Sequence, residues 1–406
     1  MFFIYALVFI LSTSLTYRFW QRLTYNTLIN IPLFIIISLY QLFGAAFKFK
    51  DLNNDVYLYI SIFVIIGSFI EIVTVFSLRN VYNNSLPLRS APAIPRLFSL
   101  FVIILSSSIL FIASLYSKQY GIISEEFEAR MASGFVGHVL VFLMITPPFI
   151  YLSYANKRIN KWTFIICLVL VFTCLFLKQV KSWIMIPTVF LFLTYLYYNN
   201  VNKKKFILYS SLGSFLLLAF FFLVYFFKTT IVNPEVDSIE LLGQIYQHFL
   251  FYLFSGVGAF SEYLSSNTGS DGSHWYVLIL PLMNVINFIT GSPMESAINP
   301  LSFVINYDIT NGSNVFTMFG TLWIYLNYFS FIFYGIIVFL QAVLYLNRSN
   351  YILCNVFWLV TSFGMFSWFE YYYFHLASYE APIYVLILSV LFSGSKSGKQ
   401  LRNNYS

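Results

Sequence analysis

The chain has 406 residues, of which 59% are hydrophobic and 9% are charged, and its formal net charge is +7. A soluble globular protein has about 25% charged residues, so this composition excludes a soluble enzyme, a disordered protein and a classical DNA-binding domain. The mean hydropathy is +0.78, and the basic residues fall in short loops between apolar runs. This pattern indicates a membrane protein with no nucleic-acid partner.

A transmembrane helix needs about 20 mainly apolar residues, and an open strand edge cannot exist in lipid. We therefore predict an all-α polytopic membrane protein with about 11 transmembrane helices, within a range of about 10–13. The N-terminus lacks a basic region and a cleavage site, so we expect a retained first span. Two further apolar stretches, 249–263 and 275–290, are expected to be interfacial or re-entrant helices. The predicted spans are 2–16, 27–47, 56–78, 97–116, 134–154, 162–177, 182–198, 206–227, 323–346, 351–369 and 379–394.

The charges orient these spans. Alternate connecting loops together hold fifteen basic and no acidic residues, and the positive-inside rule makes them cytoplasmic. The N-terminus is then outside and the C-terminus is cytoplasmic. We predict four parts: an N-terminal transmembrane bundle of about 8 spans, a large extracytoplasmic loop with short interfacial helices, C-terminal transmembrane helices and a cytoplasmic tail. Their ranges are 1–227, 228–322, 323–394 and 395–406.

Seven basic residues lie on the predicted outer side against this charge bias, and four of them lie at the outer membrane boundary. Arg130 precedes the span at 134, Lys178 and Lys181 lie in a hairpin between two spans, and Lys228 ends a span. Fixed positive charge there suits an anionic head group such as a phosphate or pyrophosphate. The alternative is that lysines at helix ends extend to the interface without binding anything.

The sequence predicts simpler roles for the other charged residues and for the cysteines. Lys48 and Lys50 lie beside Asp51 and Asp55 in sequence and are expected to form solvated pairs with them. Glu71 lies inside a predicted span, where an ionisable residue is a functional candidate by default. The three cysteines lie in apolar runs, and we find no metal-binding motif, so we expect buried thiols and no metal centre.

Histidines and aromatic residues are the remaining candidates. His138, His248, His274 and His375 all map to the outer side or the outer half of a span. Histidine accepts protons near neutral pH, although a histidine at an interface can also be purely structural. Aromatic residues around the long loop either anchor the interface or stack on sugar rings. They are Tyr246, Phe249, Tyr252, Phe260, Tyr263, Trp275 and Tyr276.

Four segments give the chain a family resemblance. An Arg-then-Gly stretch opens a mid-chain span in EEFEARMASGFVGHVL, which contains Arg130 and Gly134. The hairpin LFLKQVKSWIMIPTVFLFL has Lys181 and Ser182 where Arg-Ser is usual. FLFYLFSGVGAFSEYL has small residues before Ala259 and Phe260, and NVFTMFGTLWIYLNYFSFIFYG begins at Asn314 and includes Thr317. In this order, over roughly residues 115–340, the segments resemble the Wzy-type oligosaccharide repeat-unit polymerases of bacterial surface polysaccharides.

The sequence also departs from that family. Asp-Phe-Gly is replaced by Asn327, Tyr328 and Phe329, and the hairpin has lysine in place of arginine. Family members commonly have both termini inside, whereas the charge count places this N-terminus outside.

The resemblance implies a GT-C-like fold with a large periplasmic loop, in the bacterial cytoplasmic (inner) membrane. The activity it implies is transfer of a nascent glycan from undecaprenyl pyrophosphate to a new lipid-linked repeat unit of O-antigen or a related polysaccharide. Undecaprenyl pyrophosphate is released at the outer face. The partners would be the lipid-linked donor and acceptor, the bilayer and a chain-length regulator, with no cofactor and no metal.

The implied roles follow from this reaction. Arg130, Lys178, Lys181 and Lys228 would bind pyrophosphate, which leaves with developing negative charge. His248 is the first candidate for the base and Glu240 the second. Four residues would bind glycan or shape the loop: Asn314, Thr317, Tyr252 and Phe260. The alternatives are an O-antigen ligase-like transferase, which shares the large outer loop, and a lipid-linked oligosaccharide flippase or transporter, which would need polar pathways inside the membrane.

Overall fold

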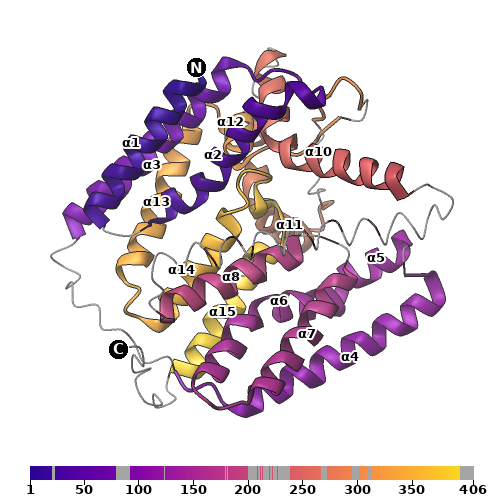
Figure 1. Cartoon of the computed structure of the whole chain (residues 1–406). Helices are drawn as coiled ribbons and strands as arrows, with labels where there is room; N and C mark the ends of the chain where they lie inside the picture. The colour runs from indigo at the N-terminus through magenta and orange to yellow at the C-terminus, as the bar shows by residue number, and fades with distance from the viewer. Residues whose placement is uncertain are drawn as a thin grey trace. The chain divides into compact units, whose positions relative to one another are not determined.

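The computed structural model is helical throughout the part of the chain that it describes (Figure 1). Within this part, β-structure is limited to two isolated bridges, Phe49 with Asn306 and Phe303 with Ser313. The all-α prediction is confirmed for these residues. They are 1–20, 23–78, 92–122, 124–178, 180, 182–199, 238–266, 272–294, 301–309 and 312–393, with isolated positions at 208, 211, 213, 219, 222 and 226.

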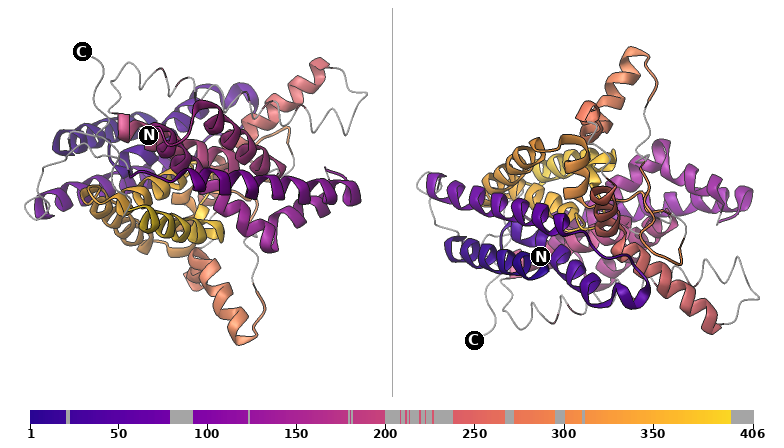
Figure 2. Two further views of the ribbon diagram at one scale, coloured as in Figure 1. Left: turned by 90° about the horizontal axis from the view of Figure 1, so that it is seen from below. Right: turned by 90° about the horizontal axis from the view of Figure 1, so that it is seen from above.

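The chain forms two compact units, each assembled from segments that are distant in sequence. Unit 1 comprises Met1–Ser85, Tyr246–Arg348 and Phe363–Tyr379. Its α3 packs against α1 and α13, and Figures 1 and 2 show α1 and α3 side by side. The elements of unit 1 are α1 (Phe2–Trp20), α2 (Tyr25–Phe43), η1 (Ala45–Phe47), α3 (Asn54–Leu78), most of α10 (Ser238–Ser265), η2 (Gly272–Ile279), α11 (Leu280–Thr290), α12 (Met318–Leu326), α13 (Phe329–Leu346) and η3 (Tyr372–Phe374).

Unit 2 comprises Leu86–Ile245, Ser349–Ser362 and Glu380–Ser406. Its α6 packs against α7 and α8, and α4 packs against α7. The prediction in four consecutive parts, divided after 227, 322 and 394, stays a prediction. The elements of unit 2 are α4 (Arg96–Tyr120), α5 (Glu125–Ala132), α6 (Gly134–Ala155), α7 (Lys161–Leu177), α8 (Ser182–Asn199), most of α14 (Tyr351–Gly364) and most of α15 (Ala377–Ser393).

The α4–α7 contact shows how the apolar pattern fixes the packing. Cys167 and Cys174 lie two helical turns apart, so they occupy one face of α7. Their thiols approach the carbonyl oxygens of Ser99 and Ser106 on α4, at 3.7 and 3.3 Å. Both thiols are buried, as is the thiol of Cys354, which confirms the prediction for all three cysteines.

The protein is a helical membrane protein. Six helices of the described part are long and apolar enough to cross a membrane: α1, α2, α3, α4, α6 and α13. Shorter apolar helices occur at Lys161–Leu177, Trp275–Thr290, Tyr351–Gly364 and Ala377–Ser393. The predicted span at 206–227 lies outside the described residues, apart from isolated positions. The number of crossings therefore stays a prediction.

Two predicted boundaries are corrected. The span expected at 323–346 is divided between α12 and α13, because Asn327 adopts a φ of +50° and ends α12. Asparagine tolerates positive φ better than most residues do. The stretch expected at 249–263 belongs to a longer helix, α10, which begins at Ser238.

Glu71 has a structural role that the sequence did not indicate. Its carboxylate accepts hydrogen bonds from the Thr24 hydroxyl at 2.6 Å and from the backbone N–H of Asn26 at 2.9 Å. Both donors lie at the start of α2, where backbone N–H groups lack partners within the helix. Glu71 on α3 therefore caps α2, and negative charge is favourable at that end of a helix.

Candidate functional site

Arg130 is presented by a short helix whose ends are defined by the sequence. The Ser124 hydroxyl caps α5 by accepting the N–H of Phe127 at 3.0 Å, and three acidic residues lie in its first turn. Arg130 lies in the last turn, where a positive charge is favourable. Gly134 then adopts a φ of +58°, which separates α5 from α6. This conformation favours glycine and explains the Arg-then-Gly spacing.

The two sides of α5 have different environments. Phe127 and Met131 are buried, whereas Arg130 is exposed. The Arg130 guanidinium carbon lies 5.9 Å from the centre of the Tyr120 ring, at the end of α4. Arg130 is therefore exposed and positioned beside an aromatic face, an arrangement that supports contact with an anion from outside.

Lys178 is buried at the C-terminal end of α7, with 8% of its surface exposed. Its ammonium lies 3.1 Å from the centre of the Trp183 ring in the first turn of α8. Burial lowers the pKa of Lys178 to about 7, while the negative charges of Glu128 and Glu380 oppose this shift. Lysine is strongly hydrated in water, so its burial needs a compensating interaction, which the aromatic face supplies in part.

His138 and Glu380 form a close histidine–carboxylate contact within unit 2. His138 Nδ1, near the start of α6, lies 2.7 Å from Glu380 Oε1, near the start of α15. The His138 side chain is 52% exposed and that of Glu380 is 16% exposed. The carboxylate is therefore largely shielded, while the imidazole can still meet a ligand. We name Glu128, His138, Lys178, Trp183 and Glu380 the Lys178 cluster.

The Lys178 cluster contains part of the predicted site and some groups that sequence reasoning missed. Of the four predicted pyrophosphate ligands, Arg130 and Lys178 belong to unit 2, whereas Lys181 and Lys228 lie outside the described residues. His138 was expected on the outer side or in the outer half of a span, but nothing in the sequence indicated that it pairs with Glu380.

The first predicted base candidate, His248, does not belong to the unit that holds the Lys178 cluster. His248 belongs to unit 1 and is exposed, with its ring 4.9 Å from that of Tyr252 in an edge-to-face contact. The side chains of Glu240 and His274 lie outside the described residues. His375 Nε2 lies 3.3 Å from Glu370 Oε1, also within unit 1.

The two remaining segments of the resemblance pack together in unit 1. The backbone N–H of Thr317 donates to the Gly256 carbonyl at 3.3 Å. A Cβ at Gly256 would lie 2.5 Å from the Trp368 carbonyl oxygen, and one at Gly320 would lie 2.9 Å from Phe260. Glycine is therefore required at both positions by close contacts.

The predicted glycan-binding or loop-shaping residues have different surroundings. Thr317 is buried, and its hydroxyl caps α12 by accepting the N–H of Gly320 at 2.9 Å. Phe260 is also buried, whereas Asn314 is exposed. Tyr252 stacks on Phe369 with ring centres 5.8 Å apart. Burial makes Thr317 and Phe260 better suited to shaping this region than to meeting a sugar.

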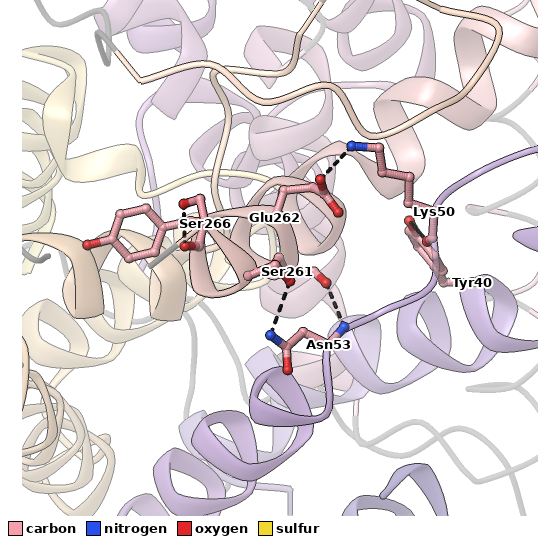
Figure 3. A network of polar contacts seen from close by, with 8 residues as sticks. Tyr40, Lys50, Asn53, Ser261, Glu262 and Ser266 are labelled. Atoms are coloured by element: carbon pink, nitrogen blue, oxygen red, sulfur yellow. Dashed lines mark hydrogen bonds and ion pairs between the residues drawn. The ribbon is translucent and has the colours of Figure 1, made fainter. Parts of the chain in front are cut away.

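The segment after η1 is fixed to α10 by a polar network (Figure 3). Lys50 Nζ lies 2.6 Å from Glu262 Oε2, and the Asn53 backbone N–H donates to the Ser261 hydroxyl at 2.7 Å. The Tyr40 hydroxyl donates to the Lys50 carbonyl at 2.8 Å. The expected pairing of the lysines with neighbouring aspartates is therefore wrong for Lys50.

The same correction applies to Lys48, which pairs with Asp308 at 2.7 Å. Lys48 adopts a φ of +60° at the end of η1, so the chain turns there. The turn directs both lysines toward segments that are distant in sequence. Both cations of this region already have carboxylate partners, which makes them poor candidates for binding an anion.

Metal binding receives no support from the described residues. Among them, no group of three or more His, Cys, Asp or Glu side chains lies close enough together to hold a metal ion.

Residues 90–398 match a family of unknown function, DUF6337. The match covers most of the chain. The protein belongs to this family. No curated protein and no solved structure matches the chain. The DUF6337 match begins just before α4 and includes the whole Lys178 cluster, together with the Gly256 and Thr317 segments.

Proposed function

We propose that this DUF6337 protein is a glycosyltransferase that polymerises lipid-linked oligosaccharide repeat units. The donor would be a glycan on undecaprenyl pyrophosphate, and the acceptor would be a sugar hydroxyl of a second lipid-linked unit. The product would be O-antigen or a related surface polysaccharide. The observation that carries the proposal is the Lys178 cluster, where a buried cation, an aromatic face and a histidine–carboxylate pair belong to one helical unit of a membrane protein.

The chemistry explains why such a cluster suits this reaction. The sugar is already activated as a pyrophosphate ester, so the enzyme must mainly stabilise negative charge that develops on the leaving group. Arg130 offers a planar fork for phosphate oxygens, and Lys178 offers a point charge in partly dry surroundings. Because burial lowers the pKa of Lys178 to about 7, an arriving pyrophosphate would favour its charged form.

The cellular setting belongs to the same proposal. Charge bias supports a cytoplasmic C-terminus and an active site at the outer face of the inner membrane. With about 11 spans, the protein would adopt a GT-C-like architecture and would take both substrates from the bilayer. Lys181 and Lys228 would complete the pyrophosphate site, and a chain-length regulator would be a partner. No cofactor or metal is proposed.

Deletion of the gene in its host tests the function, with surface glycan resolved on a gel. A ladder that collapses to a single repeat unit on the lipid core would support a polymerase, provided that a plasmid copy restores the ladder. Long polymer that stays on its carrier would indicate a ligase instead. Loss of every repeat, with lipid-linked units retained inside, would indicate a flippase. Either of the last two results would refute the polymerase proposal.

A further inference from the structure

We infer that His138 is the general base of the proposed transfer and that Glu380 is its positioning residue. The inference rests on the proposed function and replaces the sequence-based choice of His248. It is carried by the contact between His138 Nδ1 and Glu380 Oε1, at 2.7 Å, in the unit that also contains the buried Lys178.

The contact determines which imidazole nitrogen can act. A carboxylate accepts hydrogen bonds, so the neutral imidazole places its proton on Nδ1, toward Glu380. Nε2 then keeps its lone pair and can accept a proton from a substrate hydroxyl. After the transfer, the carboxylate stabilises the imidazolium that has formed. The exposed fractions of the two side chains agree with these roles. Glu380, the positioning residue, is shielded, whereas the imidazole that would meet the substrate is half-exposed.

The electrostatic influence of Glu380 on Lys178 is the second argument. The anomeric carbon that is attacked also carries the pyrophosphate oxygen that leaves. The base that accepts the hydroxyl proton and the cation that stabilises the pyrophosphate must therefore lie close to the same carbon, on opposite sides of it. Glu380 contacts His138 directly, and its charge also acts on Lys178. Both functions can therefore be supplied from unit 2 alone, by α6, α15 and the end of α7.

The reaction is balanced as follows. The acceptor hydroxyl oxygen forms a bond to the anomeric carbon of the donor glycan, and its proton passes to His138 Nε2. The bond between that carbon and the pyrophosphate oxygen breaks, and its electron pair leaves with undecaprenyl pyrophosphate, whose charge Arg130 and Lys178 stabilise. His138 then releases its proton to water. No oxidant, reductant or metal is needed.

His375 and Glu370 provide a matched control. They form a second histidine–carboxylate pair, at 3.3 Å, with similarly exposed side chains, but they belong to unit 1. If any such pair could support activity through stability alone, substitutions in the two pairs would have similar effects. The inference requires that they differ.

The test uses the full-length protein, purified and reconstituted into vesicles with a lipid-linked repeat unit as substrate. His138→Ala should lower kcat by about 10²- to 10⁴-fold and leave KM for the lipid-linked unit nearly unchanged. Free imidazole should restore part of the lost rate, because a half-exposed position leaves room for it. Glu380→Gln should also lower kcat, whereas His375→Gln should stay within about twofold of wild type. Thermal unfolding in detergent checks the fold of each variant.

Three outcomes would overturn the inference. The first is wild-type kcat in His138→Ala, and the second is an equal loss in His375→Gln. The third is a loss of activity in His138→Ala that free imidazole does not restore and that Glu380→Gln does not reproduce. This result would mean that His138 has only a structural role. If wild type itself forms no glycosidic bond from the lipid-linked donor, the proposed function fails and the inference fails with it. That result differs from the others because it appears before any substitution is made.

Discussion

Lysines of the two units have opposite environments. In unit 1, Lys48 and Lys50 each contact a carboxylate at 2.7 and 2.6 Å, so their charges are neutralised by the protein itself. In unit 2, Lys178 is more deeply buried, yet its ammonium lies over an aromatic ring. The first arrangement connects distant segments of chain. The second leaves a cation whose charge can still be compensated by a ligand.

The largest expected effect is on activity. Arg130→Ala and Lys178→Met should each lower polymer synthesis by about 10²-fold or more, because each removes a cation that stabilises the leaving pyrophosphate. Lys48→Met is the matched control, since it removes a cation that the protein already neutralises. Its activity should stay near that of wild type. Polymer length in complemented cells, with membrane protein quantified by blot, measures all three. Full-length polymer from Arg130→Ala or Lys178→Met would remove that residue from the proposed mechanism.

The sequence predicted the long apolar helices of the described part because membrane spans are long apolar runs, which a single chain reveals directly. The short polar helix α5 was not predicted. Contacts between distant residues could not be predicted in this way. Lys50 has Asp51 as its neighbour in sequence, but the turn at Lys48 brings it to Glu262. His138 and Glu380 lie on α6 and α15, and only the packing of unit 2 brings them together. Asn327 likewise gave no sign of dividing a span, because the flanking residues are apolar on both sides.

The second prediction concerns stability and pH. Lys178 has a pKa of about 7 in the folded protein and an ordinary value of 10.5 in the unfolded chain. Below pH 7 both states carry the proton, so the folded state bears the full cost of a buried charge. Between pH 7 and 10.5 the unfolded state binds more protons, so stability should rise with pH. Above 10.5 the lysine is neutral in both states and its cost is gone.

The slope should reach at most about 1.4 kcal/mol per pH unit. Lys178→Met keeps an unbranched chain that reaches Cε and removes the ammonium, so it should flatten this slope and raise stability at pH 7. Unfolding midpoints in detergent at pH 7, 8 and 9 provide the measurement, with Lys48→Met as the control that keeps the wild-type slope. Equal slopes in wild type and Lys178→Met would show that Lys178 is solvated. The distinction between the paired lysines of unit 1 and a buried lysine in unit 2 would then be wrong.

A third prediction tests how closely unit 1 is packed. Gly256→Ala should destabilise the protein by about 1–3 kcal/mol, because the added methyl would meet backbone carbonyls of Trp368 and Phe369, which cannot move independently. Gly243 lies on the same helix with open space around it. Gly243→Ala should therefore be neutral or should stabilise α10 by up to about 1 kcal/mol. Similar melting temperatures for the two variants would mean that α10 does not pack as closely as described.

The smallest expected effects are the coupling energies of the two lysine–carboxylate ion pairs of unit 1, which should differ from each other. Lys48 and Asp308 are 63% and 54% exposed, whereas Lys50 and Glu262 are 29% and 20% exposed. Water and salt screen the first pair, so its coupling should lie between about 0 and 1 kcal/mol. The second is partly shielded and lies beside the Asn53–Ser261 hydrogen bond, so its coupling should be larger. Double-mutant cycles with Lys→Met and acid→amide substitutions, in low and high salt, measure both. Equal couplings that vanish together in salt would show that neither pair fixes the chain, and that the segment after η1 is held to α10 by the asparagine and serine contacts alone.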